Sequence, residues 1–131
     1  MRNFRDLKVW QKAHQVTLEV YRVSQSFPPR EIYGLSSQVR RSAVSIEANI
    51  AEGCGRRSDR ELVRFLRIAM GSATETECHL LIARDLEYLP PKEFASLEAP
   101  LNEVKSMLHS FIEKVCLAEV PITAQVKRAG A

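Results

Sequence analysis

The sequence predicts an all-α protein that folds as a single antiparallel, up-and-down four-helix bundle. Apolar residues recur at steps of three and four in four segments, the pattern of helices that bury one side. Proline or glycine separates each segment from the next, and no segment shows the alternation typical of a strand. The connections are short, and short connections between long helices make neighbouring helices antiparallel.

The first two helices are predicted from their apolar stripes. The first stripe is Val9, Ala13, Val16, Val20, Val23 and Phe27, and the second is Leu35, Val39, Ala43, Ile46 and Ile50. Pro28 and Pro29 should end the first helix, because proline lacks the N–H group that a further turn needs. The second helix should run from about residue 34 to about residue 52. We expect Gly53 and Gly55 to end it in the left-handed conformation that glycine adopts at helix C-termini.

The third and fourth helices carry equally regular stripes. These are Leu62, Leu66, Ala69, Ala73 and Leu80 in the third, and Phe94, Leu97, Leu101, Val104, Leu108, Phe111 and Val115 in the fourth. Ser58 should cap the third helix, with Glu61 reaching back to it, and the helix should end near residue 88, before Pro90 and Pro91. Pro100 lies inside the fourth stripe, where it either kinks that helix or marks its first turn.

The composition predicts a cytoplasmic protein with one bundle domain over residues 1–120. From residue 121 to residue 131 the periodicity is lost, and we expect a disordered tail. The three cysteines are widely spaced and odd in number, which argues against a disulfide framework or a zinc site and for a reducing compartment. The first residues lack the apolar stretch of a signal peptide, and no apolar run is long enough to span a membrane.

No pattern of catalytic, phosphate-binding or dinucleotide-binding residues is present, so we expect no enzyme activity, no cofactor, no metal and no small-molecule substrate. Glu75 and His79, with Cys78 nearby, could share a metal ion, but an ordinary solvated helix face is the favoured interpretation. Cys54 precedes two arginines and could have a lowered pKa at the positive end of the third helix. A plain loop residue is the favoured interpretation there too.

The basic residues are concentrated in the first half of the chain. Residues 1–67 carry 13 Lys and Arg against 7 Asp and Glu, a net charge of +6, whereas residues 68–131 carry 6 against 9, a net charge of −3. Five of the arginines form what we term the arginine edge: Arg56, Arg57, Arg60, Arg64 and Arg67. At 100° per residue, those in the third helix lie opposite its apolar stripe, and Asp59 and Glu61 are expected on the flanks. Arginine suits phosphate oxygens, and since no aromatic residue is expected among these arginines, the pattern indicates contact with nucleic-acid backbone; an ordinary solvated face is equally consistent with it.

A second pattern lies on the second helix, where small or amide side chains border the apolar stripe. This polar seam comprises Gln38, Ser42, Ser45, Asn49 and Glu52. Val44, Ala48 and Ala51 fall on a third side, so the helix should not face water alone. We expect the seam to pack against another helix or subunit rather than to bind a ligand. Glu52 should then have a cationic or backbone donor nearby, for which Arg41 and an arginine of another helix are candidates.

The chain also resembles a known family at several motifs in order. These are residues 4–13 (FRDLKVWQKA), 33–35 (YGL), 38–41 (QVRR), 45–53 (SIEANIAEG) and 64–69 (RFLRIA), followed by Gly71, Ser72 and Glu75. The sequence resembles the ribosomal-protein-like family encoded in intervening sequences of bacterial 23S rRNA genes, over roughly residues 4–117. The resemblance implies a four-helix bundle that assembles as a ring, commonly of five subunits. Related retroelement accessory proteins bind a reverse transcriptase and nucleic acid, and the family has no catalytic residues to carry over.

Together these observations predict a non-catalytic, homo-oligomeric scaffold, a pentamer, that binds RNA or DNA backbone through the arginine edge. The alternative is a protein–protein adaptor that binds no nucleic acid, in which the same arginines meet acidic residues of a neighbour. Opposite charges on the two halves of the chain are compatible with both.

Overall fold

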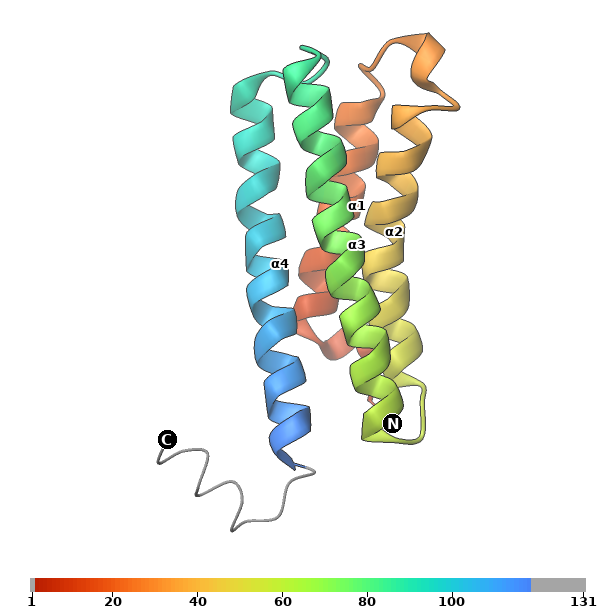
Figure 1. The fold of residues 1–131 in the computed structure, drawn as a ribbon, viewed down its shortest axis with the longest axis vertical. Helices are drawn as coiled ribbons and strands as arrows, with labels where there is room; N and C mark the ends of the chain where they lie inside the picture. The colour runs from red at the N-terminus through yellow and green to blue at the C-terminus, as the bar shows by residue number, and fades with distance from the viewer. Residues whose placement is uncertain (1, 119–131) are drawn as a thin grey trace.

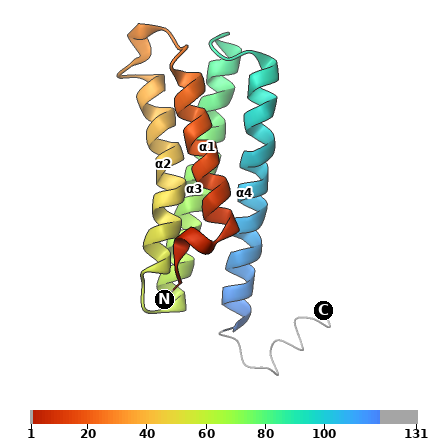
Figure 2. The same cartoon turned by 180° about the vertical axis from the view of Figure 1, so that it is seen from behind.

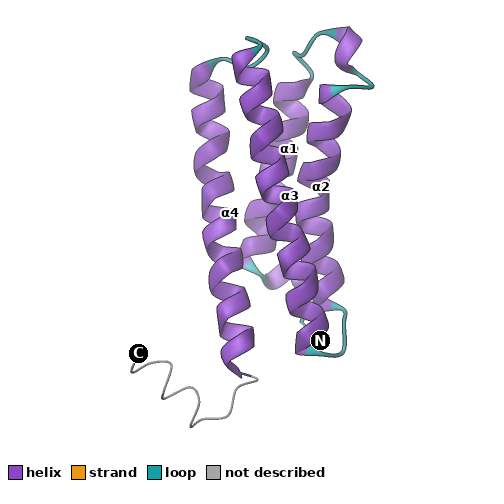
Figure 3. Ribbon diagram, in the orientation of Figure 1, coloured by secondary structure: helices purple, strands orange, loops and turns teal. Residues whose placement is uncertain are grey.

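A computed structural model describes residues 2–118 of the chain, and it confirms the all-α four-helix fold (Figure 1). The main helices are α1 (Lys8–Ser24), α2 (Leu35–Cys54), α3 (Asp59–Asp85) and α4 (Pro91–Ala118), with short 3-10 helices at Phe4–Asp6 (η1) and Pro29–Glu31 (η2). No strand occurs among residues 2–118 (Figure 3). Successive helices run in opposite directions, and Figure 2 shows the N-terminal segment crossing the lower part of the bundle. The predicted tail at residues 121–131 lies outside the described residues.

The core consists of the four predicted stripes. Every stripe residue is buried except Phe111, which is half-buried. Around the bundle α1 contacts α2, α2 contacts α3, α3 contacts α4, and α4 closes the ring by contacting α1. No helix among residues 2–118 combines the length and the apolar character needed to cross a membrane.

Several helix ends differ from the predictions. α1 ends at Ser24, before the two prolines, and Pro29 instead opens η2. α3 ends at Asp85 because Glu87 adopts the left-handed conformation (φ 63°), after which the N–H groups of Tyr88 and Leu89 both donate to the Ala83 carbonyl (2.8 and 3.2 Å).

The two glycines at the end of α2 also behave differently from the prediction. Gly53 is buried inside α2, and Gly55 follows the helix with an ordinary right-handed φ of −84°, so the left-handed cap is wrong. Gly53 is instead a point of close approach: a Cβ placed there would lie 3.0 Å from the Cβ of Phe65 and 3.1 Å from Leu62 Cδ1. A glycine at this position therefore lets α2 and α3 pack closely.

The starts of α3 and α4 show how polar and proline residues set helix boundaries. Ser58 caps α3 as predicted, its Oγ accepting a hydrogen bond from the Glu61 N–H (3.2 Å). Pro91 is the first residue of α4, where its missing N–H group has no cost. Pro100 lies within α4, which continues on both sides of it, so the first-turn alternative is wrong.

Candidate nucleic-acid interface

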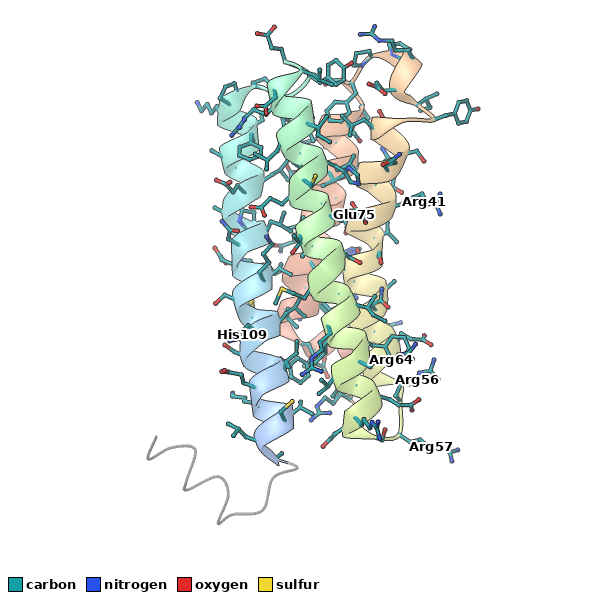
Figure 4. The ribbon with its side chains drawn as sticks, viewed as in Figure 1. Arg41, Arg56, Arg57, Arg64, Glu75 and His109 are labelled. Carbon is teal, nitrogen blue, oxygen red and sulfur yellow. The ribbon has the colours of Figure 1, made fainter. Side chains whose placement is uncertain are left out.

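The arginine edge lies where α2 turns into α3. In α3, Arg60, Arg64 and Arg67 are exposed, whereas Leu62 and Leu66 on the opposite side are buried. Arg56 and Arg57 belong to the preceding turn, and Figure 4 shows Arg57 extending away from the bundle at this end. The outward direction of these side chains agrees with the helical spacing.

An open groove of about 680 Å³ runs along this edge. Its lining consists of Arg60, Glu61, Val63, Arg64, Arg67, Ile68 and, from α4, Cys116. Val63 is buried and Ile68 is 41% exposed, so apolar side chains lie beside three guanidinium groups. Glu61, which follows Arg60 on the flank of the arginines, also lines this groove.

Phe65 is a site residue that the sequence reasoning missed. Two guanidinium groups contact its ring, with the Cζ of Arg56 4.8 Å and that of Arg64 5.4 Å from the ring centroid. Cation–π contacts of this kind orient a guanidinium while leaving the N–H groups at its edge free to donate. The helical wheel could have indicated Phe65, because it falls between the apolar stripe and the arginines.

The arginines differ in how far other charges neutralise them. Arg56 Nη2 lies 2.6 Å from Glu52 Oε1, an exposed pair one helical turn apart. Glu52 thus has a cationic neighbour as expected, and that neighbour is Arg56 of the following turn rather than Arg41 or an arginine of another helix. Arg57, Arg60 and Arg67 make no hydrogen bond or ion pair with any residue in the described range 2–118. Their charges are therefore available to an anionic ligand.

The polar seam lies mainly between α2 and α3 of the same chain. The hydroxyls of Ser45 and Ser72 are 2.8 Å apart, and the Thr76 hydroxyl lies within hydrogen-bond distance of Ser42 Oγ (2.9 Å). Asn49 donates to the Ser45 carbonyl (2.7 Å) and Ser45 Oγ (3.0 Å). Gln38 and Glu52, at the two ends of the seam, are exposed. Short hydroxyl side chains thus join the two helices and satisfy one another's hydrogen bonds.

A smaller crevice of about 410 Å³ opens over part of this seam. It is lined by Gln38, Arg41, Ser42, Ser45 and Glu75, and Figure 4 shows Arg41 pointing outward. Next to it His79 is buried, and neither ring nitrogen has a hydrogen-bond partner among residues 2–118; Nε2 lies 3.7 Å from Glu75 Oε1. In that range no three His, Cys, Asp or Glu side chains lie close enough together to hold a metal ion.

Cys54 is not an activated thiol. The residue is buried at the end of α2, and burial raises the pKa of its thiol, while the positive charge of Arg2 lowers it by a smaller amount. The alternative of a lowered pKa at the start of α3 is therefore wrong. Cys78 and Cys116 are free thiols as well, the first exposed and the second half-buried.

The chain is similar to a known protein family and to a solved structure. Residues 5–110 match the family described as 23S rRNA-intervening sequence protein. A solved structure from Bacteroides thetaiotaomicron, described as a protein of unknown function from the S23 ribosomal protein family, is similar with a TM-score of 0.74 and 27% sequence identity. The similarity covers 79% of this chain and 97% of that one. No curated protein matches the chain.

Proposed function

Because the chain belongs to the family of 23S rRNA-intervening sequence proteins, we propose that it is a non-catalytic scaffold that binds the phosphate backbone of nucleic acid. In this proposal the arginine edge makes the contacts, and five copies of the chain form a closed ring. The observation that carries the proposal is the set of exposed guanidinium groups without a partner among residues 2–118, those of Arg57, Arg60 and Arg67.

Guanidinium groups are suited to this task. Each presents several N–H donors in one plane and carries a permanent charge, so it donates paired hydrogen bonds to phosphate oxygens. The positive end of α3 lies at the same place and favours anions. Contacts to phosphate position a protein on nucleic acid without reading its sequence.

Assembly is supported by the outer side of α2. Val44 is 39% exposed and Ala48 is exposed beside it in the helical pattern, while the seam on the flank of α2 packs against α3. Small apolar side chains on an uncovered helix side suit close packing with a second copy. A head-to-tail contact with a closing rotation forms a ring, which repeats the arginine edge and raises avidity.

The alternative function, a protein–protein adaptor, makes a different use of the same surface. Acidic groups of a partner would pair with the arginines, and nucleic acid would not bind. The position of Glu61 in the groove shows that carboxylates and arginines already coexist there. The two functions are separated by whether the protein binds nucleic acid at all.

The test reverses two charges and compares the result with a matched control. The test variant combines Arg60→Glu with Arg67→Glu, which alters the arginine edge but keeps the contact of Arg64 with Phe65. The control variant combines Arg30→Glu with Lys92→Glu, which makes the same change in net charge at exposed positions elsewhere. We expect the first variant to lose at least about tenfold in affinity for mixed-sequence RNA and DNA, with a salt slope smaller by about 2. The control should bind as the wild type does, and both should keep helical circular dichroism.

Two results would count against the proposal. Equal binding by the two variants would show that the binding site lies outside the arginine edge. If the wild type bound neither RNA nor DNA at about 50 mM salt, where electrostatic binding is strong, the result would favour the adaptor.

A further inference from the structure

The groove beside the arginine edge has a composition that a phosphate-binding surface does not need. We propose that it takes a single strand of nucleic acid in preference to a duplex, with an unstacked base lying against the exposed apolar side chain of Ile68. This inference rests on the proposed function and specifies the ligand of the same site.

The apolar side chains in the lining of the groove are the first reason. Ile68 is 41% exposed and lies with Val63 and the half-buried Cys116 in the same groove as three arginines. A duplex keeps its bases stacked inside and presents charged backbone strands to a protein surface, so it would leave this apolar surface uncovered. A single strand can turn the face of a base onto it and remove both surfaces from water.

The carboxylate of Glu61 is the second reason. It lines the groove together with Arg60 and Arg64, where it would repel a ligand that offered phosphate alone. Exocyclic amino groups of adenine, cytosine and guanine are hydrogen-bond donors, and a carboxylate accepts from them. The groove thus offers donors to phosphate and an acceptor to a base edge.

The arrangement of the arginines is the third reason. Arg60, Arg64 and Arg67 follow one face of α3 over about 10 Å of helix axis, so one strand lying along the helix meets them in succession. Arg64 is oriented by its contact with the Phe65 ring, 5.4 Å from the ring centroid. A guanidinium held by its face keeps its edge donors for phosphate.

The inference and simple electrostatics predict opposite preferences. Duplex DNA has the higher charge density and releases more counterions per phosphate contact, about 0.9 against about 0.7 for a single strand. If only charge mattered, the duplex would bind at least as tightly. Tighter binding of the single strand therefore requires contact with the bases.

The experiment measures fluorescence anisotropy of the full chain with four labelled probes of equal length. These are single-stranded RNA, single-stranded DNA, the same DNA annealed to its complement, and a DNA strand with abasic sites throughout its central part. We expect the two ordinary single strands to bind at least about fivefold more tightly than the duplex and the abasic strand, because only they can place a base on Ile68. Ile68→Ser should remove this preference without changing the salt slope, because neither side chain carries a charge.

Ile82→Ser is the matched control, because Ile82 is equally exposed (42%) on the same helix and does not line the groove. It should leave all four affinities unchanged. Binding of all four probes with equal affinity would overturn the inference and leave the proposed function standing. Binding of none would overturn the proposed function, and the inference with it. A change of oligomer mass in Ile68→Ser, without a change in the binding preference, would assign the groove to contacts between copies and would also overturn the inference.

Discussion

Gly53 of α2 and Gly71 of α3 differ in the space that surrounds them. Gly53 is buried against Leu62 and Phe65, and an added Cβ would come within 3.0–3.3 Å of atoms of these residues, one of them the Leu62 carbonyl oxygen. Gly71 lies in the middle of α3, is exposed, and has no atom within 4 Å of an added Cβ. Gly53 therefore allows two helices to approach closely, whereas Gly71 has no such packing role.

This difference yields a prediction with an internal control. Gly71→Ala should raise the free energy of unfolding by about 1 kcal/mol, because alanine has the higher helix propensity. Gly53→Ala gains the same propensity but should lower the free energy of unfolding by about 1–3 kcal/mol, since the Phe65 Cβ is fixed to the backbone of α3 and cannot move aside freely. Urea unfolding measures both, and equal stabilisation of the two variants would contradict the packing described for Gly53.

At the scale of the helices, the contact between α2 and α3 depends on buried hydroxyl groups. Thr76 is fully buried, and its hydroxyl is 2.9 Å from Ser42 Oγ and 2.8 Å from the Ser72 carbonyl. Ser42 is buried too and donates to the Val39 carbonyl (3.1 Å). Thr76 has a single hydroxyl hydrogen, which it donates either to Ser42 Oγ or to the Ser72 carbonyl. A hydroxyl that remains after the other is removed therefore still has a backbone acceptor, which limits the cost of the loss.

We expect Ser42→Ala and Thr76→Val each to lower the free energy of unfolding by about 1 kcal/mol, and the double variant to cost less than the sum by at least about 0.5 kcal/mol. The measurement is a double-mutant cycle by urea unfolding. Thr76→Val combined with Ser96→Ala is the control, since Ser96 is exposed on α4 and its hydroxyl bonds only within its own helix. Full additivity of the seam pair would show that the two hydroxyls do not interact across the helices.

Sequence periodicity predicts the helices of this fold but not all of the contacts between them. The four stripes could be predicted because each depends only on the spacing of residues along one helix, and burial follows from that spacing. The role of Gly53 and the left-handed conformation of Glu87 depend on how the next segment packs, which the pattern of one helix does not contain.

The candidate site divides in the same way. The outward direction of Arg60, Arg64 and Arg67 follows from the helix period, and the structure agrees with it. The contact of the Phe65 ring with two guanidinium groups, and the position of Glu61 in the groove, depend on side-chain conformations and on the neighbouring turn. Contacts of this kind follow from the three-dimensional structure and not from the spacing of residues along one helix.

At the scale of the whole molecule, the uncovered apolar side of α2 predicts self-association. We expect light scattering coupled to size exclusion to give about five times the mass of the 14.9 kDa chain. Val44→Glu should shift the protein towards smaller species, because it places a charge in the proposed contact, whereas Ile82→Glu, at a similarly exposed position of α3, should not. A monomer mass for the wild type at micromolar concentration would contradict the proposed ring.

The central claim is that the arginine edge binds nucleic-acid backbone by charge, and the salt dependence of wild-type binding tests it most directly. Anisotropy with a labelled single strand, measured between about 50 and 200 mM salt, gives the slope of log affinity against log salt concentration. Contacts from Arg57, Arg60 and Arg67, which have no partner among residues 2–118, should each neutralise one phosphate, so the account predicts a linear fall with a slope of about −2 or steeper. An absence of binding at about 50 mM salt, or an affinity that does not change with salt, would contradict it.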